Sequence, residues 1–439
     1  METILQFGTG NFLRAFADDF LDRMNRLGLY DGKAVIVSPT DSAAVGKINA
    51  QSGRYHLLLR GIGEAGEVRE LREISSVTRA VNPYRSFDEF LTLAKNADLR
   101  IIISNTTEAG IAFDETCRFD DAPPASFPGK LTRFLFERYR CGLPGFLLLP
   151  CELIDENGVR LRECVEQYIG LWDLPDPFRR WVAEENVFCS TLVDRIVTGF
   201  PAADAAELFE EIGGEDALLD TAEPYHLWVI EGDFEQELPL KKAGVNVIWT
   251  RDAAPYKKMK VRILNGLHTS MVFPGLLAGL ETVADCMGDR DLRPFIERVL
   301  TKRILPTLPD DEAIRAFAEA VTRRFENPYL HHKLRSIALN SVSKFTVRVL
   351  PTAEDCIAAK GAVPKEFALS LAALIEYYKT NEVADDPKAA RFIRENDAAA
   401  ILKNTALWGR DLSSFLPAVE ECGEILRRDA REAIRWSIL

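Results

Sequence analysis

The first half of the chain alternates short apolar runs with segments of helical periodicity. Four runs have the length of a β-strand: residues 3–7, 34–37, 100–104 and 145–149. The last two are almost entirely apolar, which is typical of strands buried on both faces. Between the first two runs, residues 11–27 place apolar side chains at helical spacing. Such alternation predicts a parallel sheet flanked by helices.

Two further regions complete the pattern. Residues 55–60 and 68–77 flank a glycine-rich stretch, which predicts a hairpin. From about residue 250 strand patterns nearly vanish, and the predicted helices cover residues 260–282, 291–304, 310–325, 364–379 and 414–435. We therefore expect an α/β fold, with a sheet domain over residues 1–245 and a mainly helical domain over residues 246–439.

The composition fits two folded domains and disfavours several classes of partner. A chain of 439 residues exceeds the size at which one hydrophobic core stops growing. Lys and Arg number 54 against 67 Asp and Glu, a net charge of −13, so we expect neither nucleic-acid nor membrane binding. A small anionic ligand stays open, because net charge does not describe a local site.

The eight cysteines and the first residues indicate the compartment. No two cysteines form a CxxC pair, so we expect reduced thiols rather than disulfides or a zinc site. The sequence begins METILQFGTG, without the basic and apolar regions of a signal peptide. No apolar run has the roughly 18 residues that a membrane span requires. We expect a cytoplasmic protein.

A glycine-rich turn directly follows the first predicted strand. In the order strand, turn, helix, a GxG sequence lets the backbone approach a pyrophosphate, which the N–H groups at the helix start can bind. We therefore expect a Rossmann-like domain that binds a dinucleotide through Gly8, Thr9, Gly10, Asn11 and Phe12. The alternative is a tight turn without a ligand, because many turns contain glycine.

Three nearby positions also bear on how the cofactor binds and on the choice between NAD and NADP. Leu13 occupies the place of the third glycine of the usual fingerprint. Arg14 either reaches a phosphate or lies on the helix surface. Asp41 follows the second predicted strand a few residues later than the acid that binds the ribose of NAD. Because no base stands there to pair with a 2′-phosphate, the sequence favours NAD over NADP.

Polar residues also follow the apolar run at residues 100–104. Asn105, Thr106 and Glu108 come at the carboxyl end of this predicted strand, where parallel sheets bind their ligands. We expect these three residues to contact the cofactor. A helix cap or a simple turn explains the same pattern equally well.

A second group of polar residues lies on the first predicted helix of the second domain. At about 100° per residue, Lys260, Asn265 and His268 fit within one half of its surface. A lysine serves as general base when burial or nearby positive charge lowers its pKa. Neutral Asn and His side chains suit a carbonyl oxygen that gains negative charge. Alternatively, Lys260 is solvated and His268 is a core histidine.

The segment of residues 323–350 holds six bases and one acid. Within it, Arg335, Lys344 and Arg348 are candidates to bind a substrate carboxylate, since Arg can contact both of its oxygens. Simple surface charge is the alternative. The adjacent His331 and His332 do not have a metal-ligand spacing, because neighbours on a helix face different directions.

Taken together, these motifs resemble the mannitol dehydrogenase family of long-chain dehydrogenases. The stretches that carry the resemblance occur in family order: Gly8–Arg14, Thr107–Glu108, Val193–Ile196, Glu223–Glu231, Lys260–His268 and Arg324–Pro328. The resemblance implies Lys260 as the catalytic acid and base, Asn265 as the group that polarises the carbonyl and His268 as a substrate ligand. It also implies substrate contact by Lys344, and no catalytic metal.

Within the family, the chain is most similar to members that interconvert D-tagaturonate and D-altronate with NAD. The supporting stretches are Ile4–Phe16, Ser104–Gly110, Leu149–Ile154 and Ser336–Ser341. The resemblance therefore implies a small sugar-acid substrate, and a monomer or small homo-oligomer. Members that reduce D-fructuronate to D-mannonate, or that oxidise mannitol or arabinitol, are the alternatives. A non-catalytic dinucleotide sensor is an alternative of another class.

Two departures from the mannitol-type pattern argue against a simple polyol. Cys151–Leu153 reads Cys-Glu-Leu where mannitol-type members read Cys-Asp-Asn, so a second carbonyl-stabilising asparagine is absent unless Asn157 or Asn105 replaces it. Ser336 stands where those members have an arginine of the site, with Arg335 one position earlier.

Overall fold

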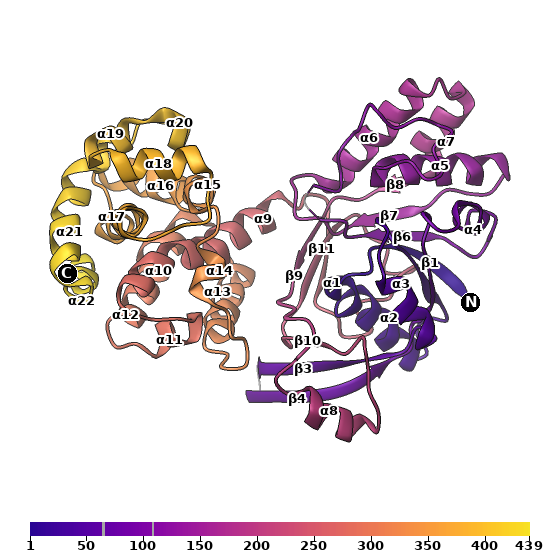
Figure 1. Ribbon diagram of the computed structural model, residues 1–439, viewed down its shortest axis with the longest axis horizontal. Helices are drawn as coiled ribbons and strands as arrows, with labels where there is room; N and C mark the ends of the chain where they lie inside the picture. The colour runs from indigo at the N-terminus through magenta and orange to yellow at the C-terminus, as the bar shows by residue number, and fades with distance from the viewer. Residues whose placement is uncertain (64–65, 108) are drawn as a thin grey trace. The chain divides into compact units, whose positions relative to one another are not determined.

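The computed structural model describes residues 1–63, 66–107 and 109–439, and it divides into two compact units, Met1–Ala254 and Pro255–Leu439 (Figure 1). In the first unit, a six-stranded parallel sheet has the order β5-β2-β1-β6-β7-β8. Its strands are β1 (Glu2–Phe7), β2 (Lys33–Val37), β5 (Val77–Val81), β6 (Ile101–Ser104), β7 (Leu147–Pro150) and β8 (Val187–Phe188). The predicted Rossmann-like sheet is confirmed.

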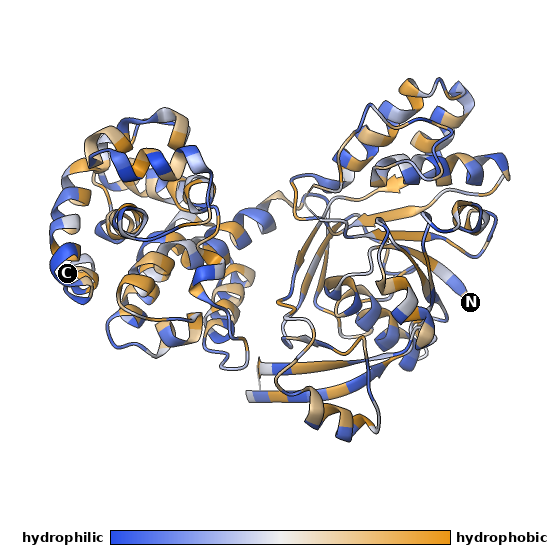
Figure 2. Cartoon of the chain, in the orientation of Figure 1, coloured by the Kyte–Doolittle hydropathy of each residue, from blue (hydrophilic) through white to orange (hydrophobic). Residues whose placement is uncertain are grey.

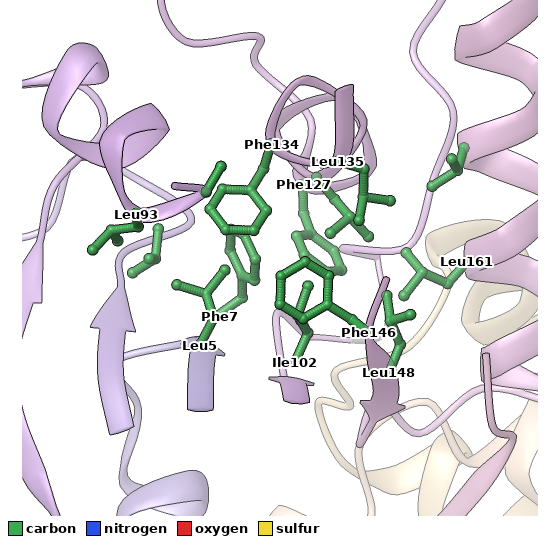
Figure 3. Packing of buried hydrophobic residues seen from close by; sticks show 14 of the residues in the cluster. Leu5, Phe7, Leu93, Ile102, Phe127, Phe134, Leu135, Phe146, Leu148 and Leu161 are labelled. Atoms are coloured by element: carbon green, nitrogen blue, oxygen red, sulfur yellow. The ribbon is translucent and has the colours of Figure 1, made fainter. Parts of the chain in front are cut away.

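Alternate residues of these strands pack into two cores, because successive side chains point to opposite faces. On one face, Leu5 and Phe7 join aromatic residues of α4 and α5, such as Phe134 (Figure 3). On the other face, Ile4 packs with Phe16 of the segment that follows β1. The helices of this unit are α1 (Asn11–Arg14), α2 (Ala17–Arg26), α3 (Ala44–Ala50), α4 (Phe87–Leu93), α5 (Phe127–Arg140), α6 (Asn157–Leu171), α7 (Asp176–Glu185) and α8 (Ala205–Ile212).

Two smaller sheets complete the first unit. The predicted hairpin forms from β3 (Tyr55–Gly63) and β4 (Gly66–Ile74), and β10 (Asp220–Ala222) pairs with β3. The third sheet contains β9 (Thr191–Asp194), β11 (Leu227–Glu231) and β12 (Val247–Thr250). The predicted strand at 68–77 is split: β4 ends at Ile74, and β5 begins at Val77 in the central sheet. Between them, Ser75 bonds the Asp22 carboxylate.

The predicted helix at 11–27 is also split, because Ala15 and Phe16 leave the helical conformation. The carbonyls of Arg14 and Ala15 accept hydrogen bonds from the side chains of Tyr55 and Arg195, each at 2.7 Å. Side chains from distant parts of the chain therefore end α1 after a single turn.

The second unit is helical among its described residues, as predicted. Apolar residues concentrate on the inward faces of its helices (Figure 2). At its centre, α17 packs against α10 and α21, and Ser370 donates a hydrogen bond of 2.8 Å to the Ser270 carbonyl. No helix in the described parts of the chain has the length and apolarity needed to cross a lipid bilayer.

The helices of the second unit begin with α9, whose first residue belongs to the first unit. They are α9 (Ala254–Lys260), a π-helical turn (Val261–Asn265), α10 (Gly266–Leu277), α11 (Val283–Gly288), α12 (Leu292–Arg298), a second π-helical turn (Val299–Ile304), a 3₁₀ turn (Leu305–Thr307), α13 (Glu312–Phe325), α14 (Leu334–Ile337), α15 (Ser341–Arg348), α16 (Leu350–Lys360), α17 (Lys365–Thr380), α18 (Pro387–Glu395), α19 (Ala398–Lys403), α20 (Thr405–Trp408), a 3₁₀ turn (Ser413–Phe415), α21 (Leu416–Arg428) and α22 (Ala430–Ile438).

Candidate functional site

The register of the central sheet aligns the carboxyl ends of four strands. Phe7 pairs with Val37 on one side and with Ser104 on the other, and Ser104 pairs with Pro150. The segments that follow β1, β2, β6 and β7 therefore begin at one edge. This is the edge at which open parallel sheets bind their ligands.

The turn after β1 uses its two glycines differently. Gly8 has a φ of 133°, and a Cβ there would lie 2.8 Å from the Asn105 carbonyl oxygen, so this position requires glycine. At Gly10 a Cβ would meet nothing within 4 Å. Gly10 is exposed, so the missing side chain leaves open space in which a phosphate can approach the backbone. The turn therefore fits a pyrophosphate.

The other predicted residues of this turn lie at its surface or just below it. Thr9 and Phe12 are half-buried, and Asn11 is exposed. Arg14 neither reaches the phosphate space nor lies on the surface. It is 5% exposed and forms an ion pair of 3.6 Å with Asp220.

Asn105 and Thr106 contact the neighbouring strand end. Asn105 Nδ2 donates to the Cys151 carbonyl at 2.8 Å. The N–H and hydroxyl of Thr106 donate to Glu152 Oε1 at 2.9 and 3.0 Å, and Ser104 donates to its Oε2 at 3.0 Å. Burial raises the pKa of Glu152. The predicted cofactor residue Glu108 lies outside the described residues.

Glu152 was not among the predicted site residues, although its position directly after a buried strand places it at this edge of the sheet. The suggested replacement by Asn157 does not fit its hydrogen bonds. Asn157 Nδ2 lies within 2.9 to 3.1 Å of three backbone carbonyls, and its Oδ1 accepts from the Thr191 N–H at 2.8 Å. The amide is buried, and these bonds leave it no polar atom for a substrate.

A cleft of about 530 Å³ lies beside the end of β2, and Asp41 is part of its lining. Asn82 donates to Asp41 Oδ1 at 2.9 Å, and Arg85 contacts both carboxylate oxygens at 3.1 and 3.0 Å. The expectation that no base stands near this position is therefore wrong. Arg85 comes from the loop after β5, so its position could not be seen from the sequence around Asp41.

In the second unit, the predicted helix around Lys260 contains a π-helical turn. Lys260 is the last residue of α9, Asn265 ends the π-helical turn and His268 lies in the first turn of α10. A π-helix has i→i+5 hydrogen bonds, so the spacing of 100° per residue does not apply across it. Lys260 is 9% exposed and Asn265 is half-buried. Lys260 is thus not a solvated surface residue.

His268 is buried between two rings. Its imidazole stacks on Phe325, with centroids 4.4 Å and planes 26° apart, and meets His332 edge-on at 4.9 Å and 79°. Its Nε2 has no hydrogen-bond partner among the described residues. Burial, followed by the neighbouring positive charges, lowers the pKa of His268 well below 6.5. The ring is therefore neutral at neutral pH, with a nitrogen unused by the protein.

The neighbours that disfavour a charge on His268 are His332, whose ring meets it edge-on, and three bases of α13 and α15. Arg324, Lys344 and Arg348 each lower the pKa of His268. Arg324 is 4% exposed, and Arg348 lies close to α10, since a Cβ on Gly266 would be 3.2 Å from its carbonyl oxygen. Two predicted carboxylate ligands thus act on the same ring, together with Arg324, which the sequence analysis named only within the basic segment and the family stretch Arg324–Pro328.

The third predicted carboxylate ligand is not part of this group. Arg335 is exposed in α14, and among the described residues its side chain has no ion-pair or hydrogen-bond partner. Lys344, in contrast, is half-buried and donates to the Ile337 carbonyl at 3.0 Å. Arg262, which follows Lys260 closely in the sequence, forms an ion pair of 2.5 Å with Asp355.

Comparisons with known proteins agree over the whole chain. Residues 2–242 match the family model of the mannitol dehydrogenase Rossmann domain, and residues 252–425 match that of the mannitol dehydrogenase C-terminal domain. Among curated relatives, the altronate oxidoreductase of Yersinia enterocolitica is 44% identical, covering 100% of this chain and 96% of the relative. That of Escherichia coli is 42% identical, covering 99% and 96%.

Two solved structures share the fold. D-sorbitol dehydrogenase in substrate-free form has a TM-score of 0.86 and 25% identity, covering 98% of this chain and 94% of that one. Mannitol 2-dehydrogenase of Pseudomonas fluorescens, solved with NAD and D-mannitol, has a TM-score of 0.77 and 23% identity, covering 99% and 93%.

Proposed function

Because the chain belongs to the mannitol dehydrogenase family and is an oxidoreductase acting on a CH–OH group, we propose that it interconverts D-tagaturonate and D-altronate with NAD. The observation that carries the proposal is the group of three cations around the neutral ring of His268. A sugar acid has a carboxylate for these cations, whereas a simple polyol has none. The names of the full-length relatives support the same substrate pair.

We assign the proton transfer to Lys260. In reduction, its ammonium gives a proton to the substrate oxygen as the carbonyl carbon receives hydride, and in oxidation the neutral amine takes the proton back. The bound nicotinamide supplies or accepts the hydride. The amide of Asn265 donates to the same oxygen and stabilises the negative charge that develops on it. Burial of Lys260 supports this role, because it favours the neutral amine.

His268 is proposed to bind the substrate as a neutral ring. Its unused Nε2 can form a hydrogen bond with a substrate hydroxyl. The carboxylate is assigned to Lys344 and Arg348, whose charges act on the same ring, with exposed Arg335 as the remaining candidate. An arginine can contact both oxygens of a carboxylate, and a lysine ammonium can donate to one of them.

For the cofactor, we propose that Gly8, Gly10 and Phe12 hold the pyrophosphate turn and that Asp41 selects NAD. The Asp41 carboxylate lines an open cleft at the strand end where the adenosine ribose binds in such sheets. A carboxylate accepts hydrogen bonds from the ribose diol and repels a 2′-phosphate. Arg85 does not reverse this choice, because its guanidinium already contacts both oxygens of Asp41 and is not presented to a 2′-phosphate. The eight free thiols support a reducing compartment such as the cytoplasm.

The test is NADH oxidation with tagaturonate, fructuronate and fructose side by side. The proposal expects the highest kcat/KM with tagaturonate and little turnover of fructose, which has no carboxylate. A preference for fructuronate would indicate the D-mannonate-forming alternative. Efficient reduction of fructose would contradict the role of the basic group, and no turnover of any of the three would favour a dinucleotide sensor.

A further inference from the structure

A buried arginine lies directly beneath the proposed dinucleotide turn. The guanidinium of Arg14 donates to Asn11 Oδ1 at 2.5 Å and to the Leu218 carbonyl. It also pairs with the Asp220 carboxylate at 3.6 Å and lies 5.3 Å from the centroid of the Tyr55 ring. One side chain thus joins the turn to β10 and β3. Because its charge is paired inside the protein, it is not oriented as a phosphate ligand.

The contact with Asn11 fixes how that amide is oriented. A guanidinium only donates hydrogen bonds, so the Asn11 atom that faces it must be the oxygen. The nitrogen Nδ2 therefore lies on the other side, with no hydrogen-bond partner in the described ranges, and Asn11 is exposed at the turn. Gly199 lies on that side, and a Cβ on it would be only 2.5 Å from Nδ2. The absence of a side chain at Gly199 therefore leaves room for the amide.

We propose that Arg14 is a positioning residue for dinucleotide binding: it holds Asn11 so that Nδ2 donates to a phosphate oxygen, and it does not touch the phosphates itself. This inference rests on the proposed binding of NAD at the turn. It assigns the role to geometry rather than to the positive charge. Lysine at this position would keep the charge but could not reproduce the planar fork that reaches Asn11, Leu218 and Asp220 together.

The experiment is a double-mutant cycle on NADH affinity, measured by fluorescence titration of the full chain. Arg14→Lys and Asn11→Ala should each weaken NADH binding roughly tenfold, as expected for loss of a hydrogen bond to a charged group. In the Asn11→Ala background, Arg14→Lys should add less than about twofold, because coupled residues are not additive. At saturating NADH, kcat should fall far less than affinity.

A matched control is available in the same unit. Arg138 is fully buried and binds backbone carbonyls, including those of Pro144 and Leu99 at 2.9 Å. Arg138→Lys should lower the Tm without a comparable change in NADH affinity. If Arg14→Lys does not fold, Arg14→Gln combined with Asp220→Asn removes both buried charges and takes its place in the cycle.

If the wild-type protein binds NADH, three results would contradict the role of Arg14 and leave the proposed function intact. The first is wild-type NADH affinity of Arg14→Lys. The second is a double variant in which the affinity losses of Arg14→Lys and Asn11→Ala multiply. The third is a reduced salt dependence of NADH binding when the charge at Arg14 is removed, which would indicate a direct phosphate contact. If the wild type does not bind NADH, the proposed function fails and this inference fails with it.

Discussion

The imidazole of His268 stacks on the phenyl ring of Phe325, with ring centroids 4.4 Å apart and planes inclined by 26°. Phe325 is the last residue of α13, and His268 lies in the first turn of α10. The contact excludes water from one face of the imidazole and fixes its plane. It therefore favours the neutral ring and orients the nitrogen that we assign to the substrate.

Replacing Phe325 tests whether this orientation matters. Phe325→Leu keeps an apolar side chain but removes the stacked pair, whose contribution is about 0.5–1.5 kcal/mol beyond burial. We expect kcat/KM for tagaturonate to fall roughly two- to tenfold. Phe273→Leu is the control, because Phe273 is equally buried in α10 but contacts Tyr377 and Tyr378. It should lower the Tm with little effect on kcat/KM; equal effects of both variants would deny Phe325 a role in the site.

The depressed pKa of His268 predicts its titration. The folded protein resists protonating a ring that the unfolded chain protonates near 6.5, so this group lowers the free energy of unfolding as pH falls below about 6.5. In NMR spectra, the His268 ring signals should not shift between about pH 6 and 8. A titration midpoint of His268 within that range would contradict its assignment as a neutral substrate ligand, in which burial and nearby cations disfavour protonation.

The two glycines of the turn should differ when each is replaced by alanine. Gly8→Ala forces a side chain into a φ of 133° and against the Asn105 carbonyl, so we expect a lower Tm and weak NADH binding. Gly10→Ala meets no protein atom within 4 Å, so its Tm should be unchanged. Its methyl group enters the proposed phosphate space, and NADH affinity should fall. Normal affinity of a folded Gly10→Ala protein would place the phosphates elsewhere.

Asp18 predicts an unusual pH dependence of stability. This carboxyl is 1% exposed, and burial raises its pKa from 3.8 to about 7. Between these values the folded protein keeps a proton that the unfolded chain releases, so this group lowers the free energy of unfolding as pH rises from about 4 to 7. Asp18→Asn should remove that slope, and the variant should gain stability relative to wild type across this window.

The control for Asp18 is a carboxyl with the opposite shift. Hydrogen bonds from Thr116 lower the pKa of Asp114 below 3.8, so Asp114→Asn should alter the pH dependence only below about pH 4. Urea unfolding of the three proteins at several pH values measures both effects. Parallel pH profiles of wild type and Asp18→Asn between pH 4 and 7 would show that Asp18 is ionised in the fold.

The sequence predicted those features that depend on neighbouring residues. The strands at 101–104 and 147–150 are buried on both faces, so their apolar runs identified them. The turn at Gly8 was recognisable because the strand before it, its glycine and the helix after it are adjacent in the chain. Even there, the helix was predicted too long, since hydrogen bonds from Tyr55 and Arg195 end α1.

Features made by residues far apart in the chain could not be predicted. The burial of Arg14 depends on Asp220, and the cleft at Asp41 receives Arg85 from another loop. The π-helical turn after Lys260 leaves no trace in the apolar periodicity. The spacing of 100° per residue holds for an α-helix, so it does not give the angle between Lys260 and His268. The motif supplied the candidate residues, whereas the surroundings of each side chain depend on the fold.

The most direct test of the account compares NADH oxidation by wild type and Lys260→Ala with tagaturonate as substrate, together with NADH binding by both. Wild type should reduce tagaturonate. Lys260→Ala should fold and bind NADH as wild type does, while kcat falls by about 10²- to 10⁴-fold, the usual contribution of a positioned acid or base. Failure of wild type to oxidise NADH with tagaturonate, or a Lys260→Ala variant with the wild-type rate, would contradict it.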